Sequence, residues 1–290
     1  MRSQIDLRPS AIAGRWYPAE AHQLARSVDG YLEAARLPKI EGRVIAVMAP
    51  HAGHLYSGPV AGYAFAALRG LEPEVVAVVS PMHFPYQPAL LTSAHSAYET
   101  PLGAVHIDTA SLKALDEILQ AELGFGLTPL RNDPEHSLEI ELPFLQRALQ
   151  GSFGLIPVMM RDQTARVARV LGEALAKVLA GRPALLVAST DLSHFYPQQL
   201  ANALDAEMLH QVEAFDPAGV LRVEEEGKGF ACGRSALATV LWAARALGAD
   251  RVQVLRHATS GDVTGDYSEV VGYAAAVVTK AVITKKESFD

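Results

Sequence analysis

The chain has 290 residues, half of them apolar, which is enough to bury one large α/β domain or two small ones. A net charge of −7 and scattered basic residues exclude a nucleic-acid-binding surface. With a single cysteine, no apolar signal segment and no apolar stretch of the roughly 20 residues that a membrane helix needs, we expect a cytoplasmic protein without disulfides or membrane contact.

Short apolar runs alternate with amphipathic segments along the chain, which is typical of a layered α/β fold. The pattern predicts helices at 23–35, from about 59, and at 109–120, 137–149, 164–179 and 235–247. Strands are predicted at 44–49, 75–79, 89–92, 104–107, 153–159, 185–188, 252–256 and 272–278.

The segment 89–107 is predicted to form a hairpin at a sheet edge, because two short runs flank the turn signal at 98–103. No repeat or linker interrupts the chain, so we expect a single domain over 1–290 with a polar tail from about 284. Its fold class is α/β, with a central mostly parallel or mixed sheet and helices on both faces.

Three of the apolar runs lead directly into a short turn that ends in histidine. These histidines are His51, His83 and His194. Continuous apolar runs indicate parallel strands buried on both faces, and such sheets place ligands just beyond the carboxyl ends of their strands. The three imidazoles are therefore predicted to meet in one metal or acid/base site.

The residues next to these histidines allow more than one role. His54 lies further along the loop after His51, where it either competes as a ligand, lines the site or sits at the surface. Asp191 precedes His194 by three residues, and it either orients the imidazole or caps the next helix.

Two further segments carry candidate site residues. Cys232 precedes a predicted helix and is followed by Arg234; it is either a thiol of lowered pKa or a small buried apolar residue. Glu135 and His136 lie on a loop that could reach the site, with His136 supporting the ligands or lining the pocket. Ser137 is predicted to cap a helix whose first turn holds Glu139 and Glu141 in a structural role.

The remaining histidines lack comparable surroundings, so we expect structural roles for His22, His95, His106, His210 and His257. A nucleotide enzyme is disfavoured because the chain has no Gly-x-Gly-x-x-Gly or Walker-type phosphate loop. The lack of a Gly-x-Ser-x-Gly elbow likewise disfavours a serine hydrolase.

Several of these motifs occur together in one known family. They are the segments 13–18, 49–58, 80–83, 135–143, 189–194 and 231–234. In these the chain resembles the Memo family, known in prokaryotes as AmmeMemoRadiSam system protein B, over nearly its whole length. The resemblance implies a fold related to the class III extradiol dioxygenases.

The resemblance also implies a set of site residues. The metal ligands would be His51, His83 and Cys232, with His194 as the remaining site histidine and Trp16 at the pocket rim. Fe(II), the metal of the dioxygenases, is the first candidate; a thiolate in place of their carboxylate makes the set softer, so copper or zinc would also fit.

These expectations lead to a Memo-like metal-binding protein with a non-haem iron dioxygenase-like cleft. As an enzyme it would be a redox catalyst for an unknown small substrate, with His194 moving a proton and Asp191 orienting it. The alternative is a non-catalytic module that binds a peptide or protein and works with radical SAM and AMMECR-type partners. A zinc hydrolase with His194 as base is a third hypothesis.

Overall fold

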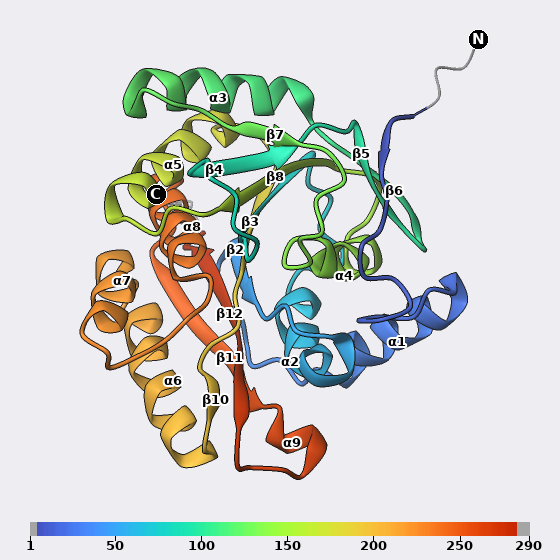
Figure 1. Cartoon of the computed structure of the whole chain (residues 1–290), viewed down its shortest axis with the longest axis vertical. Helices are drawn as coiled ribbons and strands as arrows, with labels where there is room; N and C mark the ends of the chain where they lie inside the picture. Colours follow the sequence, from blue (N-terminus) through green and yellow to red (C-terminus); the bar gives the residue numbers. More distant parts are fainter. Residues whose placement is uncertain (1–4, 283–290) are drawn as a thin grey trace, which may run out of the picture.

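Four neighbouring parallel strands form the centre of the computed structural model, which describes residues 5–282 (Figure 1). The polar tail predicted from about 284 lies outside the described residues. The four strands, in hydrogen-bonded order, are β2 (Arg43–Ala49), β9 (Ala184–Ser189), β3 (Val75–Pro81) and β8 (Gly154–Met160). Both faces of these strands are covered, which explains their continuous apolar sequences.

Antiparallel pairs extend this parallel centre on both sides into a nine-stranded sheet. The long strand β12 pairs antiparallel with β2, β10 and β11, whereas β4 pairs antiparallel with β8 and parallel with β7. The predicted mixed sheet is therefore confirmed. The strands outside the parallel centre are β12 (Val270–Lys280), β10 (His194–Tyr196), β11 (Arg251–Thr259), β4 (Leu90–Ser93) and β7 (Thr128–Leu130).

Helices cover both faces of the sheet, as predicted (Figure 1). Alternate residues of β3 divide between the faces: Val76 and Val78 pack with α1, α2 and α4, whereas Val75 and Val79 pack with the helices opposite. The first group is α1 (Ala21–Ala34), α2 (His54–Ala66) and α4 (Leu142–Ala148). The second is α3 (Thr109–Leu123), α5 (Ala165–Leu179), α6 (Gln198–Glu213), α7 (Pro217–Glu225) and α8 (Arg234–Ala246).

The predicted hairpin over 89–107 is wrong in its pairing. The hairpin joins β5 (Ala97–Thr100) to β6 (Gly103–His106). Its turn is only residues 101–102, so part of the predicted turn at 98–103 belongs to the strands. With β1 (Leu7–Arg8) these strands form a separate three-stranded sheet, while β4 belongs to the large sheet.

Two predicted helix boundaries also differ. Helix α2 begins at His54, not near Pro59, because the amides of Tyr56 and Ser57 already bond the Gly53 carbonyl. The helix predicted over 137–149 starts as a 3-10 turn, η1 (Glu139–Glu141), and continues as α4. A short helix, α9 (Gly261–Thr264), follows β11. Within residues 5–282, no helix combines the length and apolar character needed to cross a bilayer.

Candidate metal centre

The sheet topology brings His51 and His83 to the same edge. His51 lies two residues beyond β2 and His83 two residues beyond β3, and only β9 separates these two parallel strands. Their imidazole centroids are 5.2 Å apart. The prediction that three strand-end histidines meet is confirmed for His51 and His83, whereas His194 does not belong to the histidine cluster found within residues 5–282.

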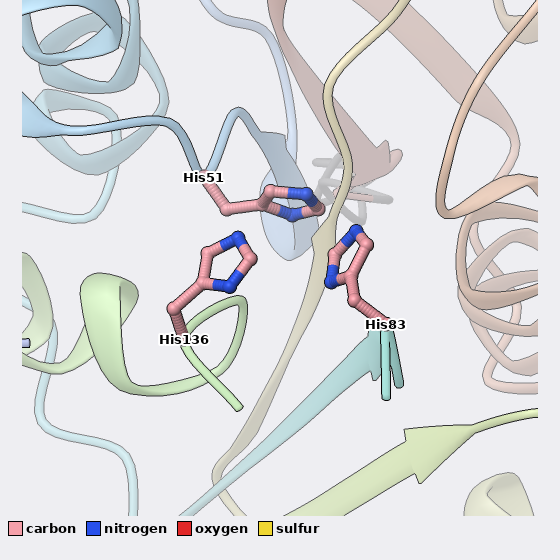
Figure 2. A group of neighbouring side chains, drawn as sticks. All are labelled: His51, His83 and His136. Atoms are coloured by element: carbon pink, nitrogen blue, oxygen red, sulfur yellow. The ribbon is translucent and has the colours of Figure 1, made fainter. Parts of the chain in front are cut away.

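The third member of the cluster is His136, from the loop that precedes η1. The possible ligand atoms of His51, His83 and His136 all lie within 4.8 Å of one another. Figure 2 shows the three rings facing a shared space. His51 is buried, His136 is partly buried and His83 is exposed, so solvent reaches the cluster from the His83 side.

Glu135 holds two of the three histidines. Its Oε1 atom is 2.9 Å from His83 Nδ1 and 3.3 Å from His136 Nδ1. The carboxylate also accepts hydrogen bonds from the backbone amides of His83, His136 and Ser137. With Nδ1 engaged in this way, the Nε2 lone pairs of both rings are left for a ligand.

His51 is fixed by different partners. Its backbone amide donates to Asp191 Oδ1 at 2.7 Å, and its Nδ1 atom lies 2.9 Å from Ser189 Oγ. Its Nε2 atom is 3.1 Å from Cys232 Sγ. His51 therefore also presents Nε2 toward the site.

The electrostatics keep the buried histidines neutral, which is the form that binds a metal. Burial lowers the pKa of His51 well below its usual value and that of His136 to about 4. Although burial opposes it, hydrogen bonds from His83 and from the backbone amide of Ser137 lower the pKa of Glu135 to about 2. Two neutral imidazoles thus stand beside an ionised carboxylate.

Arg8 anchors the loop that carries Glu135 and His136. Its buried guanidinium bonds the Asp133 carboxylate, Glu139 Oε2 at 2.6 Å, and the backbone carbonyls of Asp133 and Glu135. No sequence pattern predicted this role of Arg8. Arg8 and Asp133 are separated by 125 positions, and no local pattern marks such a partner.

Asp191 does not orient His194, which corrects one of our expectations. Both carboxylate oxygens are turned to the His51 loop, where Asp191 Oδ2 lies 4.0 Å from His51 Nε2. Burial raises the pKa of Asp191 to about 7. His194 Nδ1 instead donates to the Leu192 carbonyl at 2.7 Å, because the chain turns back there into β10.

Of the two alternatives for Cys232, the thiol of lowered pKa is wrong. Burial raises the pKa of this thiol, and the nearby Asp191 carboxylate adds to the effect. Arg234 cannot offset this, because its guanidinium pairs with Glu224 at 3.1 Å. Cys232 nevertheless lies beside the cluster through its contact with His51.

His54 lies outside the cluster. It begins α2 and is buried, with ring centroids 4.8 Å from Phe144 and 5.3 Å from Tyr17. Burial lowers its pKa to about 4. Trp16 lies near both His136 and His54. Its ring centroid is 4.1 Å from that of His136, and together with His54 it lines a surface pocket of about 340 Å³.

The acidic residues of η1 do more than begin a helix. Glu139 is buried against Arg8 and accepts from Tyr17 Oη at 2.7 Å, whereas Glu141 is buried behind Ser189. Ser137 does not cap the helix, since its hydroxyl donates to the Pro81 carbonyl. Two of the histidines given structural roles have carboxylate partners: His95 bonds Asp6, and His257 bonds Asp205.

Comparison with known proteins points to one family. The model of the family described as Memo-like protein matches residues 8–277. The MEMO1 family proteins of Methanothermobacter thermautotrophicus and Thermotoga maritima are 37% and 34% identical to the chain over 279 and 283 residues. These alignments cover 92% and 93% of this chain and 99% of each relative.

A solved structure is similar in fold. It is that of an uncharacterised protein from Escherichia coli K12, with a TM-score of 0.50 and 15% identity. The match covers 81% of this chain and 100% of the other. At this identity the likeness concerns the fold alone.

Proposed function

Since the chain belongs to the Memo-like protein family, as its motifs suggested, we propose that it binds a transition-metal ion through His51, His83 and His136. The observation that carries the proposal is the convergence of three imidazoles whose ligand atoms lie within 4.8 Å of one another. Glu135 and Ser189 lie at the Nδ1 atoms of these rings, so Nε2 is the atom of each ring that can bind the metal. Partners of this kind orient metal-binding histidines in many proteins.

The donor set favours a borderline metal. Imidazole suits iron, copper and zinc, and a nearby thiol makes the set softer. We propose Fe(II) as the first candidate, in keeping with a fold related to the class III extradiol dioxygenases, and copper or zinc as alternatives. Cys232, the third ligand that the resemblance implies, is the alternative to His136, because its Sγ lies only 3.1 Å from His51 Nε2.

We further propose a redox role on a small substrate. A bound iron or copper ion would supply Lewis acidity and a site for electron transfer. His194 is the group that would move a proton, because its Nδ1 donates to the Leu192 carbonyl and Nε2 remains a base. Trp16, packed on His136, would form part of the substrate pocket.

The test is metal content after anaerobic purification of the wild type, His51→Ala and His83→Ala. We expect Fe(II), copper or zinc in the wild type and its loss in both variants. His22→Ala, at an exposed position of α1, is the matched control and should retain the metal. Equal metal in all four proteins would overturn the proposal.

A second candidate is a module that binds a peptide or protein, with radical SAM or AMMECR-type proteins as partners. Two exposed aromatic residues favour it: Phe84 directly follows His83 and is 37% exposed, and Phe195 directly follows His194 and is 69% exposed. Purified partner proteins should then bind His51→Ala as well as the wild type and lose affinity for Phe195→Ser. Loss of binding in His51→Ala alone would favour the metal-dependent role.

A further inference from the structure

Ser189 Oγ lies at the centre of a buried group of three polar neighbours. The Ser137 carbonyl oxygen is 2.6 Å away, Glu141 Oε1 is 2.7 Å away, and His51 Nδ1 is 2.9 Å away. The Ser189, Glu141 and His51 side chains are all buried. Each of the three distances is that of a hydrogen bond.

The hydrogen-bonding capacity of a hydroxyl decides the directions of these bonds. A serine has one proton to donate and two lone pairs that accept. The Ser137 carbonyl can only accept, so it takes the Ser189 proton. Glu141 and His51 must then both donate to Ser189 Oγ.

An ionised Glu141 would not fit this arrangement. Its carboxylate and the Ser137 carbonyl would compete for the single hydroxyl proton at 2.7 and 2.6 Å. One of the two oxygens would then face a serine lone pair without a proton between them. A proton on Glu141 removes the conflict.

The surroundings of Glu141 agree with a neutral carboxyl group. Among residues 5–282, no lysine, arginine or histidine forms an ion pair with it, and its Oε2 atom has no hydrogen-bond partner. Burial raises the pKa of Glu141 well above its usual value, and the Asp191 carboxylate adds to the effect. A buried unpaired carboxylate would be strongly destabilising.

We propose that Glu141 is a neutral carboxylic acid that donates to Ser189 Oγ, the same oxygen to which His51 donates as its Nδ1–H tautomer. The Nε2 atom of His51 is then unprotonated, and its lone pair lies on the side of Cys232 Sγ, 3.1 Å away. Glu141 is in this sense a positioning residue that acts through Ser189. The hydrogen-bond assignment applies to the metal-free protein, whereas its consequence for metal binding rests on the proposed function.

Two spectroscopic measurements on the metal-free full chain test the assignment. The first is infrared difference spectroscopy of Glu141→Gln against the wild type at about pH 9, where a group of pKa about 7 such as Asp191 is ionised. A protonated-carboxyl C=O band should appear in the wild type and be absent from Glu141→Gln. A wild type without such a band would overturn the proposal.

The second measurement is nitrogen NMR of labelled histidines, with His51 assigned by its loss in His51→Asn. Glu141→Gln should keep the Nδ1–H tautomer, because its amide can donate to Ser189 as the acid does. Glu141→Met should keep it too, because the Ser137 carbonyl still takes the Ser189 proton and His51 must still donate. Ser189→Ala removes the shared oxygen, so we expect the Nε2–H tautomer to become populated in that variant alone. An Nε2–H tautomer in the wild type, or a changed tautomer in Glu141→Gln, would contradict the assignment.

Zinc titration then separates the two proposals. We expect Glu141→Met to weaken Zn(II) binding about tenfold and Glu141→Gln to change it by less than about twofold, as for residues that orient metal ligands. A wild type that binds no metal would overturn the proposed function, but the infrared and NMR results would still test the hydrogen-bond assignment of Glu141. Equal Zn(II) affinity in Glu141→Met and the wild type would overturn the positioning role.

Discussion

Glu135 Oε1 lies 2.9 Å from His83 Nδ1, while its partner oxygen accepts the backbone amide of the same histidine at 2.6 Å. One carboxylate thus fixes both the ring and the backbone of His83. Because it also lies 3.3 Å from His136 Nδ1, Glu135 sets the relative position of two of the three imidazoles.

Glu135→Gln should weaken metal binding by about 10- to 100-fold, since loss of a carboxylate that orients metal-binding histidines typically has this effect. The amide keeps the volume but cannot accept on both sides from so many donors. Titration with Zn(II) measures the change. Glu117→Gln, on the exposed side of α3, is the control, and a Glu135→Gln protein that binds as tightly as this control would refute the role.

The third ligand can be identified by comparing two variants. We expect His136→Ala to lower affinity by more than about a hundredfold, beyond what loss of an orienting partner causes. Cys232→Ala should lower it less, because burial raises the pKa of this thiol and the thiol must lose its proton before it can bind a metal. Cobalt substitution provides the readout, since a sulfur-to-metal charge-transfer band would reveal Cys232 as a ligand. A strong band that disappears in Cys232→Ala would reverse the assignment.

Arg8→Ala should destabilise the protein by about 3 to 5 kcal/mol, because it leaves the buried Asp133 and Glu139 carboxylates without their cation. Urea unfolding measures the free energy of unfolding. For comparison, Arg169→Ala removes an exposed pair with Glu173 and should cost no more than about 0.5 kcal/mol. Similar losses in the two variants would show that the Arg8 network contributes little.

Stability should fall as the pH drops from 6.5 to about 4, in part through His54. Burial lowers the pKa of folded His54 from 6.5 to about 4, so in this window the unfolded chain takes up a proton that the folded chain does not. The contribution of neutral His54 to the free energy of unfolding is fully present above pH 6.5 and falls by about 3 kcal/mol between pH 6.5 and pH 4.

His54→Gln isolates that contribution, because His51 and His136 also have lowered pKa values. The variant should show a shallower decline of unfolding free energy between pH 6.5 and 4 than the wild type. His22→Gln controls for the substitution itself. Parallel pH profiles for wild type and His54→Gln would rule out the linkage.

Much of the fold follows from local sequence patterns. The uninterrupted apolar runs of β2, β3 and β9 indicated buried parallel strands, and the order of strands and helices indicated a layered sheet. The hairpin partner was missed because β4 and β5 are both only four residues long, and only pairing across the chain distinguishes them. The start of α2 at His54 was missed because Pro59 suggested a later first turn.

The sequence by itself determined that His51 and His83 would meet, because parallel strands end at one edge of a sheet and each histidine follows its strand directly. Only the tertiary structure decided the rest of the site. It placed His136 in the cluster, the Asp191 carboxylate next to the His51 loop instead of His194, and the Glu141 carboxyl group next to Ser189 Oγ. The physical reason is that these residues act through hydrogen bonds between distant loops, whose geometry is set by packing and burial, whereas strand periodicity is a property of neighbouring residues.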